Sequence, residues 1–156
     1  MEHLHEALAG FPVVVTLPLL WGDMDALGHV NNTVYLRWCE TARVDYLMRV
    51  GLWQMLSAER VGPIMASVSC DYEQPLNYPD TVHVGARVTR IGNSSFRMEH
   101  RIVSHALGVV AATGDSTLVV LDYNQKKPVP VPAHIRKAIE KLENRAFGGA
   151  PDASGQ

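Results

Sequence analysis

The spacing of apolar side chains along the chain predicts one long helix near the N-terminus. Over residues 31–50, apolar positions such as Tyr35, Cys39 and Ala42 recur every three or four residues, which predicts a helix of about five turns. Gly51 follows directly and is typical of a helix end. Bulky apolar residues occupy more than one side of this segment, so we expect other elements to enclose it.

Alternating apolar and polar positions predict β-strands on both sides of this helix. Pro12 and Pro18 mark the first strand as an edge or irregular strand, because proline cannot donate to a strand ladder. The last strand is apolar on both faces, which is typical of a central strand. Short turns join the strands after the helix, so we expect them to be antiparallel. The predicted strands are 11–20, 63–72, 81–91, 95–103 and 108–122.

A second helix is predicted at 132–142, where Ile135, Ile139 and Leu142 lie on one stripe and Pro132 falls near the first turn. The order of elements is therefore strand, long helix, four antiparallel strands and C-terminal helix. One sheet that curls around one helix buries that helix and defines an α+β fold. Its other face needs cover, and we expect an apolar outer face that packs against a second subunit.

These elements form one predicted domain over residues 12–144. Residues 1–11 are expected to be an N-terminal extension, and residues 145–156 a disordered tail.

Composition narrows the possible partners. The chain has 156 residues and a formal net charge of −2, which gives no reason to expect nucleic acid or an anionic membrane as partner. Cys39 and Cys70 form neither a disulfide framework nor a metal-ligand cluster, so we expect two reduced thiols. The N-terminus is too polar for a signal peptide, and the chain has no run of about 18 apolar residues. We therefore expect a cytoplasmic protein.

The loop before the long helix, WGDMDALGHVNN, carries the candidate chemistry. It places Asp23, Asp25 and His29 within seven residues and leads straight into the helix. An Asp in a glycine-containing loop before a helix is usually a turn former or a cap. A carboxylate placed there is also close to the free N–H groups and the positive end of the helix, which suit a developing oxyanion.

The run WGDMDALGHVNNTVYLRWCETARVDYL and the order of elements resemble the hot-dog fold acyl-CoA thioesterases, in particular the branch of 4-hydroxybenzoyl-CoA thioesterase. The resemblance extends over residues 12–142, with D-x-D-x-x-G-H-V-N-N-x-x-Y as the specific motif and IGNSSF as a weaker one. It implies a five-stranded antiparallel sheet wrapped around a long central helix, with a C-terminal helix. The implied reaction is hydrolysis of an acyl- or aroyl-CoA to free acid and coenzyme A, without metal or cofactor. The implied assembly is a homodimer or homotetramer with active sites at subunit interfaces.

The resemblance also assigns roles within the loop. Asp25 occupies the position of the catalytic carboxylate, and backbone N–H groups between His29 and Asn32 hold the thioester carbonyl, with the amide of Asn32 as the main donor. Gly28 and Val30 flank His29 and are expected to contact substrate.

The neighbouring residues have less certain assignments. Asp23 is expected to be structural, accepting backbone N–H groups within the loop. Asn31 is a natural helix N-cap beside the substrate site. His29 either takes part in the chemistry at the site or only orders the loop, and Tyr35 lines either the acyl pocket or the core.

The IGNSS turn is the candidate site for the nucleotide of coenzyme A. Arg90 and Arg97 flank the turn and suit phosphate groups, while Asn93, Ser94 and Ser95 offer further donors. The alternative is a plain β-turn with exposed arginines on the strand faces.

Two other functions remain open. One is a hot-dog acyl-thioester hydratase or dehydratase, although such enzymes typically show D-x-N-P-x-H, whereas Asp25 and His29 are four apart with no proline between them. The other is a non-catalytic acyl-CoA-binding protein. The sequence leaves open the acyl group, the choice of dimer or tetramer, and whether Asp25 acts as nucleophile or general base.

Overall fold

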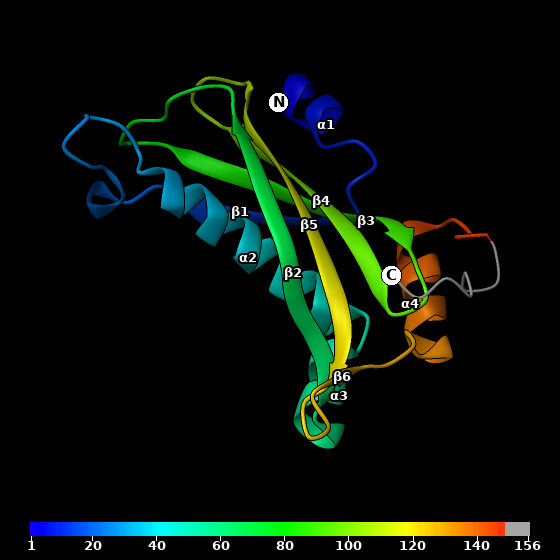
Figure 1. The fold of residues 1–156 in the computed structure, drawn as a ribbon. Helices are drawn as coiled ribbons and strands as arrows, with labels where there is room; N and C mark the ends of the chain where they lie inside the picture. The colour runs from blue at the N-terminus through cyan, green and yellow to red at the C-terminus, as the bar shows by residue number, and fades with distance from the viewer. Residues whose placement is uncertain (149–156) are drawn as a thin grey trace.

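The computed structural model describes residues 1–148 and consists of a curled antiparallel sheet with a long helix on its inner face (Figure 1). The strand order is β1-β3-β4-β5-β2, and a two-residue strand, β6 (Lys127–Pro128), pairs with β5. All neighbouring strands are antiparallel. The predicted five-stranded α+β hot-dog arrangement is confirmed, with β6 as a short addition. The long strands are β1 (Val13–Pro18), β2 (Val61–Tyr72), β3 (Thr81–Ile91), β4 (Ser95–Ser104) and β5 (Val110–Asp122).

The central helix, α2 (Asn32–Arg49), lies within one residue of its predicted bounds. It begins where the side chain of Asn31 caps it, because Oδ1 of Asn31 accepts a hydrogen bond from the N–H of Thr33 at 2.9 Å. Its buried face, which includes Ala42 and Tyr46, packs mainly on β1 and β3. Among residues 1–148, no helix is both long enough and apolar enough to cross a membrane.

Two short α-helices and one 3-10 helix, η1 (Trp21–Asp23), were not predicted. In the N-terminal extension, α1 (Glu2–Ala7) precedes β1, and α3 (Leu52–Glu59) begins directly after α2. Gly51 separates α2 from α3 with a φ of +86°, a conformation that favours glycine. Leu56 of α3 lies so close to β2 that a Cβ on Gly62 would come within 2.7 Å of it. The eight-residue length of α3 gave too weak a periodic signal to distinguish it from a connecting segment.

The C-terminal helix, α4 (Ala133–Glu143), is confirmed near its predicted bounds and buries Ile135 and Ile139. Its last residue, Glu143, ties it to two other elements. The carboxylate accepts the hydroxyl of Tyr46 at 2.7 Å and the backbone N–H of Val88 at 2.6 Å. Beyond α4, Phe147 is buried; residues 149–156 of the predicted tail lie outside the described residues.

The inner face of β2 is the part of the sheet that α2 leaves uncovered. Met65 pairs with Leu118 of β5 and Val68 pairs with Ser116, because a bulge lies between Met65 and Ser67. The bulge places Met65 and Val68 on the same face, so the predicted strict alternation is wrong there. Their exposed fractions are 37% and 49%. The exposed apolar surface near the sheet edge therefore lies on β2.

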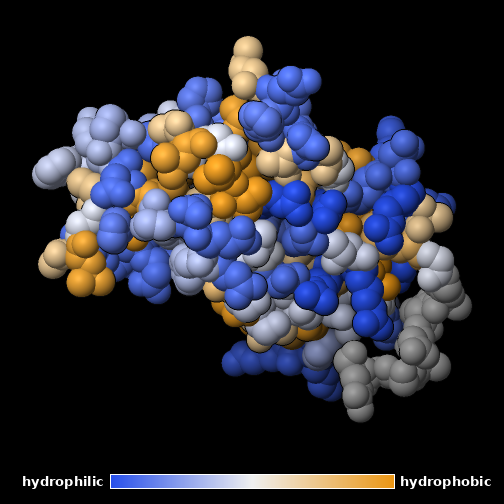
Figure 2. Space-filling model, turned by 90° about the horizontal axis from the view of Figure 1, so that it is seen from above, coloured by the Kyte–Doolittle hydropathy of each residue, from blue (hydrophilic) through white to orange (hydrophobic). Residues whose placement is uncertain are grey.

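The centre of the outer face of the sheet is polar, so the prediction of an apolar outer face is wrong there, and apolar side chains such as Ile64, which pairs with Val119, lie toward the β2 edge. Arg97 pairs with Asp115 across β4 and β5, and Arg87 pairs with Glu99 across β3 and β4. The inner face of β4 carries buried Phe96 and Met98 instead. On the face seen in the space-filling view, hydrophobic side chains gather in one patch, and hydrophilic side chains surround it and cover most of the rest (Figure 2).

Candidate active site

The loop between β1 and α2 folds into a tight turn around Asp25. The N–H of Asp25 donates to the carbonyl of His29, and the N–H of Gly28 donates to the carbonyl of Asp25, each at 3.0 Å. Gly28 has a φ of +81° and closes the turn. Met24 and Val30 form an isolated antiparallel bridge at its base. This turn brings Asp25 back beside the first residues of α2.

Two hydrogen bonds orient the half-buried carboxylate of Asp25. Its Oδ1 accepts the N–H of Leu27 and its Oδ2 accepts the side-chain amide of Asn31, both at 2.9 Å. Asn31 also caps α2 through its own oxygen. One side chain therefore connects the carboxylate to the start of the helix.

Asp23 has the structural contacts expected of it. It is buried, and its Oδ2 accepts the N–H of Leu20 at 2.8 Å. Its Oδ1 lies 3.4 Å from Nη2 of Arg37, and its backbone carbonyl accepts the N–H of Asn31 at 2.9 Å. These contacts join both sides of the loop to α2.

The N-terminus of α2 leaves one amide available. The N–H of Thr33 is bound by the Asn31 side chain, and the N–H of Val34 donates to the Asn31 carbonyl at 3.0 Å. Within residues 1–148 the N–H of Asn32 has no protein acceptor. A free first-turn amide at the positive end of a helix is suited to bind an oxyanion.

Asp25 and Asn32 line the same cavity, which has a volume of about 340 Å³. It brings together five residues predicted for the site: Asp25, His29, Val30, Asn32 and Tyr35. His29 is exposed, whereas Tyr35 is buried, so Tyr35 serves both the core and the cavity wall. Of the other two loop residues in the prediction, Gly28 closes the turn and Asn31 contacts Asp25 from outside this cavity.

The far wall of this cavity comes from the end of β2, which sequence reasoning missed. The hydroxyl of Tyr35 donates to the carbonyl of Gln74 at 3.1 Å, and the hydroxyl of Tyr72 donates to the carbonyl of Asn32 at 3.2 Å. The rings of Tyr35 and Tyr72 meet edge to face at 5.1 Å. Burial raises the pKa of both tyrosines, so both phenols are neutral. No local motif identifies Tyr72 or Gln74, because only the sheet brings them to α2.

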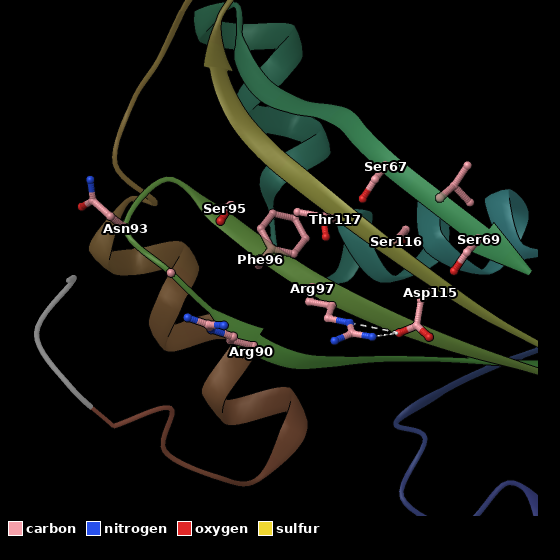
Figure 3. A pocket seen from close by; sticks show the side chains of 12 residues that line it. Ser67, Ser69, Arg90, Asn93, Ser95, Phe96, Arg97, Asp115, Ser116 and Thr117 are labelled. Atoms are coloured by element: carbon pink, nitrogen blue, oxygen red, sulfur yellow. Dashed lines mark hydrogen bonds and ion pairs between the residues drawn. The ribbon is translucent and has the colours of Figure 1, made fainter. Parts of the chain in front are cut away.

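The predicted nucleotide-binding residues line a different concavity, of about 600 Å³, on the outer face of the sheet (Figure 3). Arg90 and Arg97 are partners in the β3–β4 register, and both line it with Asn93 and Ser95. Ser94 is not among the lining residues; its carbonyl accepts the N–H of Val120. This concavity shares no residue with the cavity at Asp25.

The two arginines differ in their pairing. Nε and Nη2 of Arg97 both lie within 3.1 Å of Oδ1 of Asp115 (Figure 3). Arg90 forms no ion pair with residues 1–148. Arg90 is therefore the cation available to an anionic group in this concavity.

A match to a family model shows which protein superfamily includes this chain. Residues 19–139 match the model of the thioesterase-like superfamily. The chain belongs to this superfamily. The predicted resemblance is thereby confirmed at the level of the family, and the thioesterase-like loop, helix and sheet are those described above.

Several proteins that are similar to this chain are named as thioesterases. The long-chain acyl-CoA thioesterase FadM of Escherichia coli is 24% identical over 119 residues, covering 76% of this chain and 90% of FadM. The acyl-CoA thioesterase YbgC of Haemophilus influenzae is 26% identical over 135 residues, covering 85% of this chain and 95% of YbgC. A thioesterase from Thermus thermophilus, solved with coenzyme A and zinc, has a TM-score of 0.78 and 38% identity. That alignment covers 88% of this chain and 98% of the Thermus chain.

The Thermus thioesterase was solved with zinc as well as coenzyme A. Within residues 1–148, no three His, Cys, Asp or Glu side chains are grouped so that they could hold a metal ion.

Proposed function

We propose that this protein is an acyl-CoA thioesterase, which hydrolyses the thioester of an acyl- or aroyl-CoA to a free acid and coenzyme A. The observation that carries the proposal is the shared cavity, in which the oriented carboxylate of Asp25 lies with the unpaired N–H of Asn32. The acyl-CoA thioesterase names of FadM and YbgC, and the coenzyme A in the Thermus structure, support the same substrate class.

In the proposed mechanism, the thioester carbonyl oxygen accepts the N–H of Asn32 at the positive end of α2. Negative charge that develops on this oxygen is stabilised there. Asp25 either attacks the carbonyl carbon to form a mixed anhydride, which water then hydrolyses to the free acid, or removes a proton from the attacking water. The amide of Asn31 fixes the orientation of the carboxylate, because it donates a hydrogen bond to Oδ2. The thiolate of coenzyme A is the leaving group in both routes.

We also propose that the active protein is a homodimer or homotetramer with its sites at the subunit interface. β2 is a 12-residue edge strand whose inner face exposes Met65 and Val68. Such an edge is normally paired or covered. The separation of the Asp25 cavity from the Arg90 concavity within one chain fits a site to which two subunits contribute.

The direct test is a hydrolysis panel of acetyl-, octanoyl-, palmitoyl- and aryl-CoA, followed by release of free thiol. Turnover of at least one substrate by the wild-type protein, and its loss in Asp25→Asn, are the expected results. Addition of water to an enoyl-CoA without thiol release would favour the hydratase alternative. Saturable acyl-CoA binding with no turnover of any kind would favour a binding protein and overturn the proposal.

We further propose a cytoplasmic location. Cys39 is buried and Cys70 half-buried, and both are free thiols, the state typical of a reducing compartment.

A further inference from the structure

The connection between β2 and β3 holds the loop that carries Asp25. We call residues 76–80 of this connection the cradle segment. At its two ends, the N–H of Val30 donates to the carbonyl of Leu76, and the N–H of Leu19 donates to the carbonyl of Asp80, each at 2.9 Å. The cradle segment therefore runs antiparallel to the loop and binds it both before and after Asp25.

Both ends of the cradle segment are themselves anchored. Leu76 is fully buried in the core. The carboxylate of Asp80 accepts the N–H of Ala106 at 2.9 Å through Oδ1 and the hydroxyl of Ser104 through Oδ2. Ser104 is also fully buried. The ends of the segment are thus fixed by the core and by the turn after β4.

The middle of the cradle segment contacts the loop through Asn77. The side-chain amide of Asn77 donates to the carbonyl of Gly28 at 2.5 Å. Within residues 1–148, this is the one hydrogen bond that a cradle side chain makes to the loop. The neighbouring residue contributes weaker contacts, because the N–H of Tyr78 lies 3.5 Å from Sδ of Met24 and its ring meets Trp21 edge to face at 5.8 Å.

Gly28 is the residue on which the shape of the Asp25 turn depends. Its N–H donates to the carbonyl of Asp25, the N–H of Asp25 donates to the carbonyl of His29, and Gly28 has a φ of +81°. This is the pattern of a β-bulge with glycine at its first position, which leaves part of the ladder unpaired. The carbonyl of Gly28 accepts no backbone N–H within residues 1–148. Asn77 supplies the donor that the bulge lacks.

The contact with Asn77 restricts a backbone that glycine leaves free. Gly28 has no side chain to limit its conformation. A peptide unit is planar, so a hydrogen bond to the Gly28 carbonyl fixes the plane that joins Gly28 to His29. The carbonyl of His29 in turn accepts the N–H of Asp25. Asn77 is therefore connected to Asp25 through two backbone groups.

We propose that Asn77 is a positioning residue for the hydrolysis proposed above. Through the Gly28 carbonyl, it fixes the turn that places the carboxylate of Asp25 beside the N-terminus of α2. Asn77 itself does not line the Asp25 cavity, so it acts without touching the substrate. Both Asn77 and Gly28 are exposed, and an exposed hydrogen bond adds little to the net stability of the fold. Loss of this contact is therefore expected to affect turnover more than stability.

Three substitutions of Asn77 test this role by thiol release. Asn77→Ala is expected to lower kcat by about tenfold or more, because a misplacement of about 1 Å at a reacting group can cost about 10²-fold. Its KM is expected to stay within about twofold of wild type, and its melting temperature within about 4 °C. Asn77→Asp keeps the shape of the side chain but presents an acceptor to the Gly28 carbonyl, so its loss of kcat is expected to be at least as large. Asn77→Gln keeps an amide donor and is expected to have a higher kcat than both.

Two control variants separate positioning from a general loosening of the connection. Ser104→Ala removes the hydroxyl that anchors Asp80. It is expected to lower the melting temperature more than Asn77→Ala does, with kcat within a few-fold of wild type while the protein is folded. Tyr78→Phe keeps the ring against Trp21 and is expected to leave kcat unchanged. Wild-type kcat in Asn77→Ala, or an equal loss of kcat in folded Ser104→Ala, would overturn the proposal.

A two-dimensional nitrogen–proton spectrum measures the loop independently of activity. Asn77→Ala is expected to shift the amide signals of residues 25–29, whereas Ser104→Ala is expected to leave them in place. Unshifted signals in Asn77→Ala would show that Asn77 does not position the turn. A wild-type protein that releases no thiol from any acyl-CoA would contradict the proposed function, and with it the catalytic part of this inference. The spectrum would still decide whether Asn77 fixes the loop.

Discussion

The side chain of Asn31 donates to Oδ2 of Asp25 at 2.9 Å while its own oxygen accepts the N–H of Thr33 at the same distance. A single residue thus caps α2 and orients the proposed catalytic carboxylate. The carboxylate and the oxyanion-binding end of the helix are therefore held in a fixed relationship by one short side chain, and changes at either group test that relationship.

Asp25→Asn is expected to lower kcat by about 10² or more with the fold intact, the scale expected when a positioned base or nucleophile is lost. Steady-state thiol release and a circular dichroism spectrum measure the two effects. Asp45→Asn, which alters an exposed ion pair, is the matched control and is expected to retain wild-type turnover. Near-normal kcat in purified Asp25→Asn would show that this carboxylate is not catalytic.

Asp23→Asn distinguishes the second acid of the loop from the first. Because Asp23 holds the N–H of Leu20 at 2.8 Å, its change is expected to act mainly on stability, by about 1–3 kcal/mol. At a temperature where the variant is folded, kcat is expected to remain within a few-fold of wild type. A loss of kcat as large as that of Asp25→Asn in a fully folded protein would refute this division of roles.

Asn31→Asp is expected to keep the helix cap but to displace the carboxylate of Asp25. Aspartate caps as well as asparagine, whereas the new carboxylate lies against Asp25 and no longer donates to it. Two negative charges at this distance repel each other, so kcat, measured by thiol release, is expected to fall by about tenfold or more. Asn31→Ser, which also caps but adds no charge, is the control and is expected to lose less activity. A kcat for Asn31→Asp no lower than that of Asn31→Ser would rule out coupling between the two side chains.

His100 is expected to make the fold sensitive to acid. Burial, and to a lesser extent the neighbouring Arg43, lowers the pKa of His100 from 6.5 to about 3. The folded protein therefore holds His100 neutral, and the unfolded chain binds a proton below pH 6.5. The stability contributed by the neutral imidazole is complete above pH 6.5 and is lost as the pH falls toward 3. At pH 4.5 the loss is about 3 kcal/mol.

Urea unfolding at about pH 7.5 and about pH 4.5 measures this effect. His100→Met removes the titrating group from the same buried position, so its free energy of unfolding is expected to fall less between the two pH values than that of wild type. His134→Gln removes an exposed histidine on α4 and is expected to keep the wild-type dependence. Equal losses in wild type and His100→Met would show that other groups cause the acid sensitivity.

Arg90→Ala is expected to raise KM for acyl-CoA with little change in kcat, the signature of lost uniform binding. Arg90 lines the outer concavity without an ion pair in the described chain, whereas Arg97 is already neutralised by Asp115. Arg97→Ala is therefore expected to raise KM less. The wild-type KM is expected to rise with ionic strength, because exposed charges are screened beyond about 8 Å at physiological salt.

A pantetheine thioester, which lacks the nucleotide, provides the control for the Arg90 prediction. The KM and kcat for this thioester are expected to stay the same in Arg90→Ala and at higher ionic strength. Arg49→Ala, which removes an exposed arginine on α2, is expected to change neither substrate's KM. If Arg90→Ala weakened turnover of acyl-CoA and the pantetheine thioester equally, the nucleotide would be held elsewhere.

The sequence alone determined the features that depend on neighbours along the chain. The period of apolar positions identified α2 and the five long strands, because each such element hydrogen-bonds in a regular local pattern and turns one face to the core. The candidate site residues in the loop before α2 could also be predicted from the sequence. Asp25, Asn31 and Asn32 lie within eight residues, so the turn at Gly28 and the helix cap suffice to bring them together.

Only the tertiary structure revealed the features that depend on the register of the sheet and on the burial of side chains. Tyr72 and Gln74 reach the Asp25 cavity only because β2 ends beside α2, and the bulge after Met65 decided which face of β2 is apolar. The burial of Arg43 could not be predicted from the sequence either. Helical spacing shows on which side of α2 a residue lies, but not whether another element covers that side. These properties arise from contacts between residues far apart in sequence, whose strand pairing and packing no local pattern encodes.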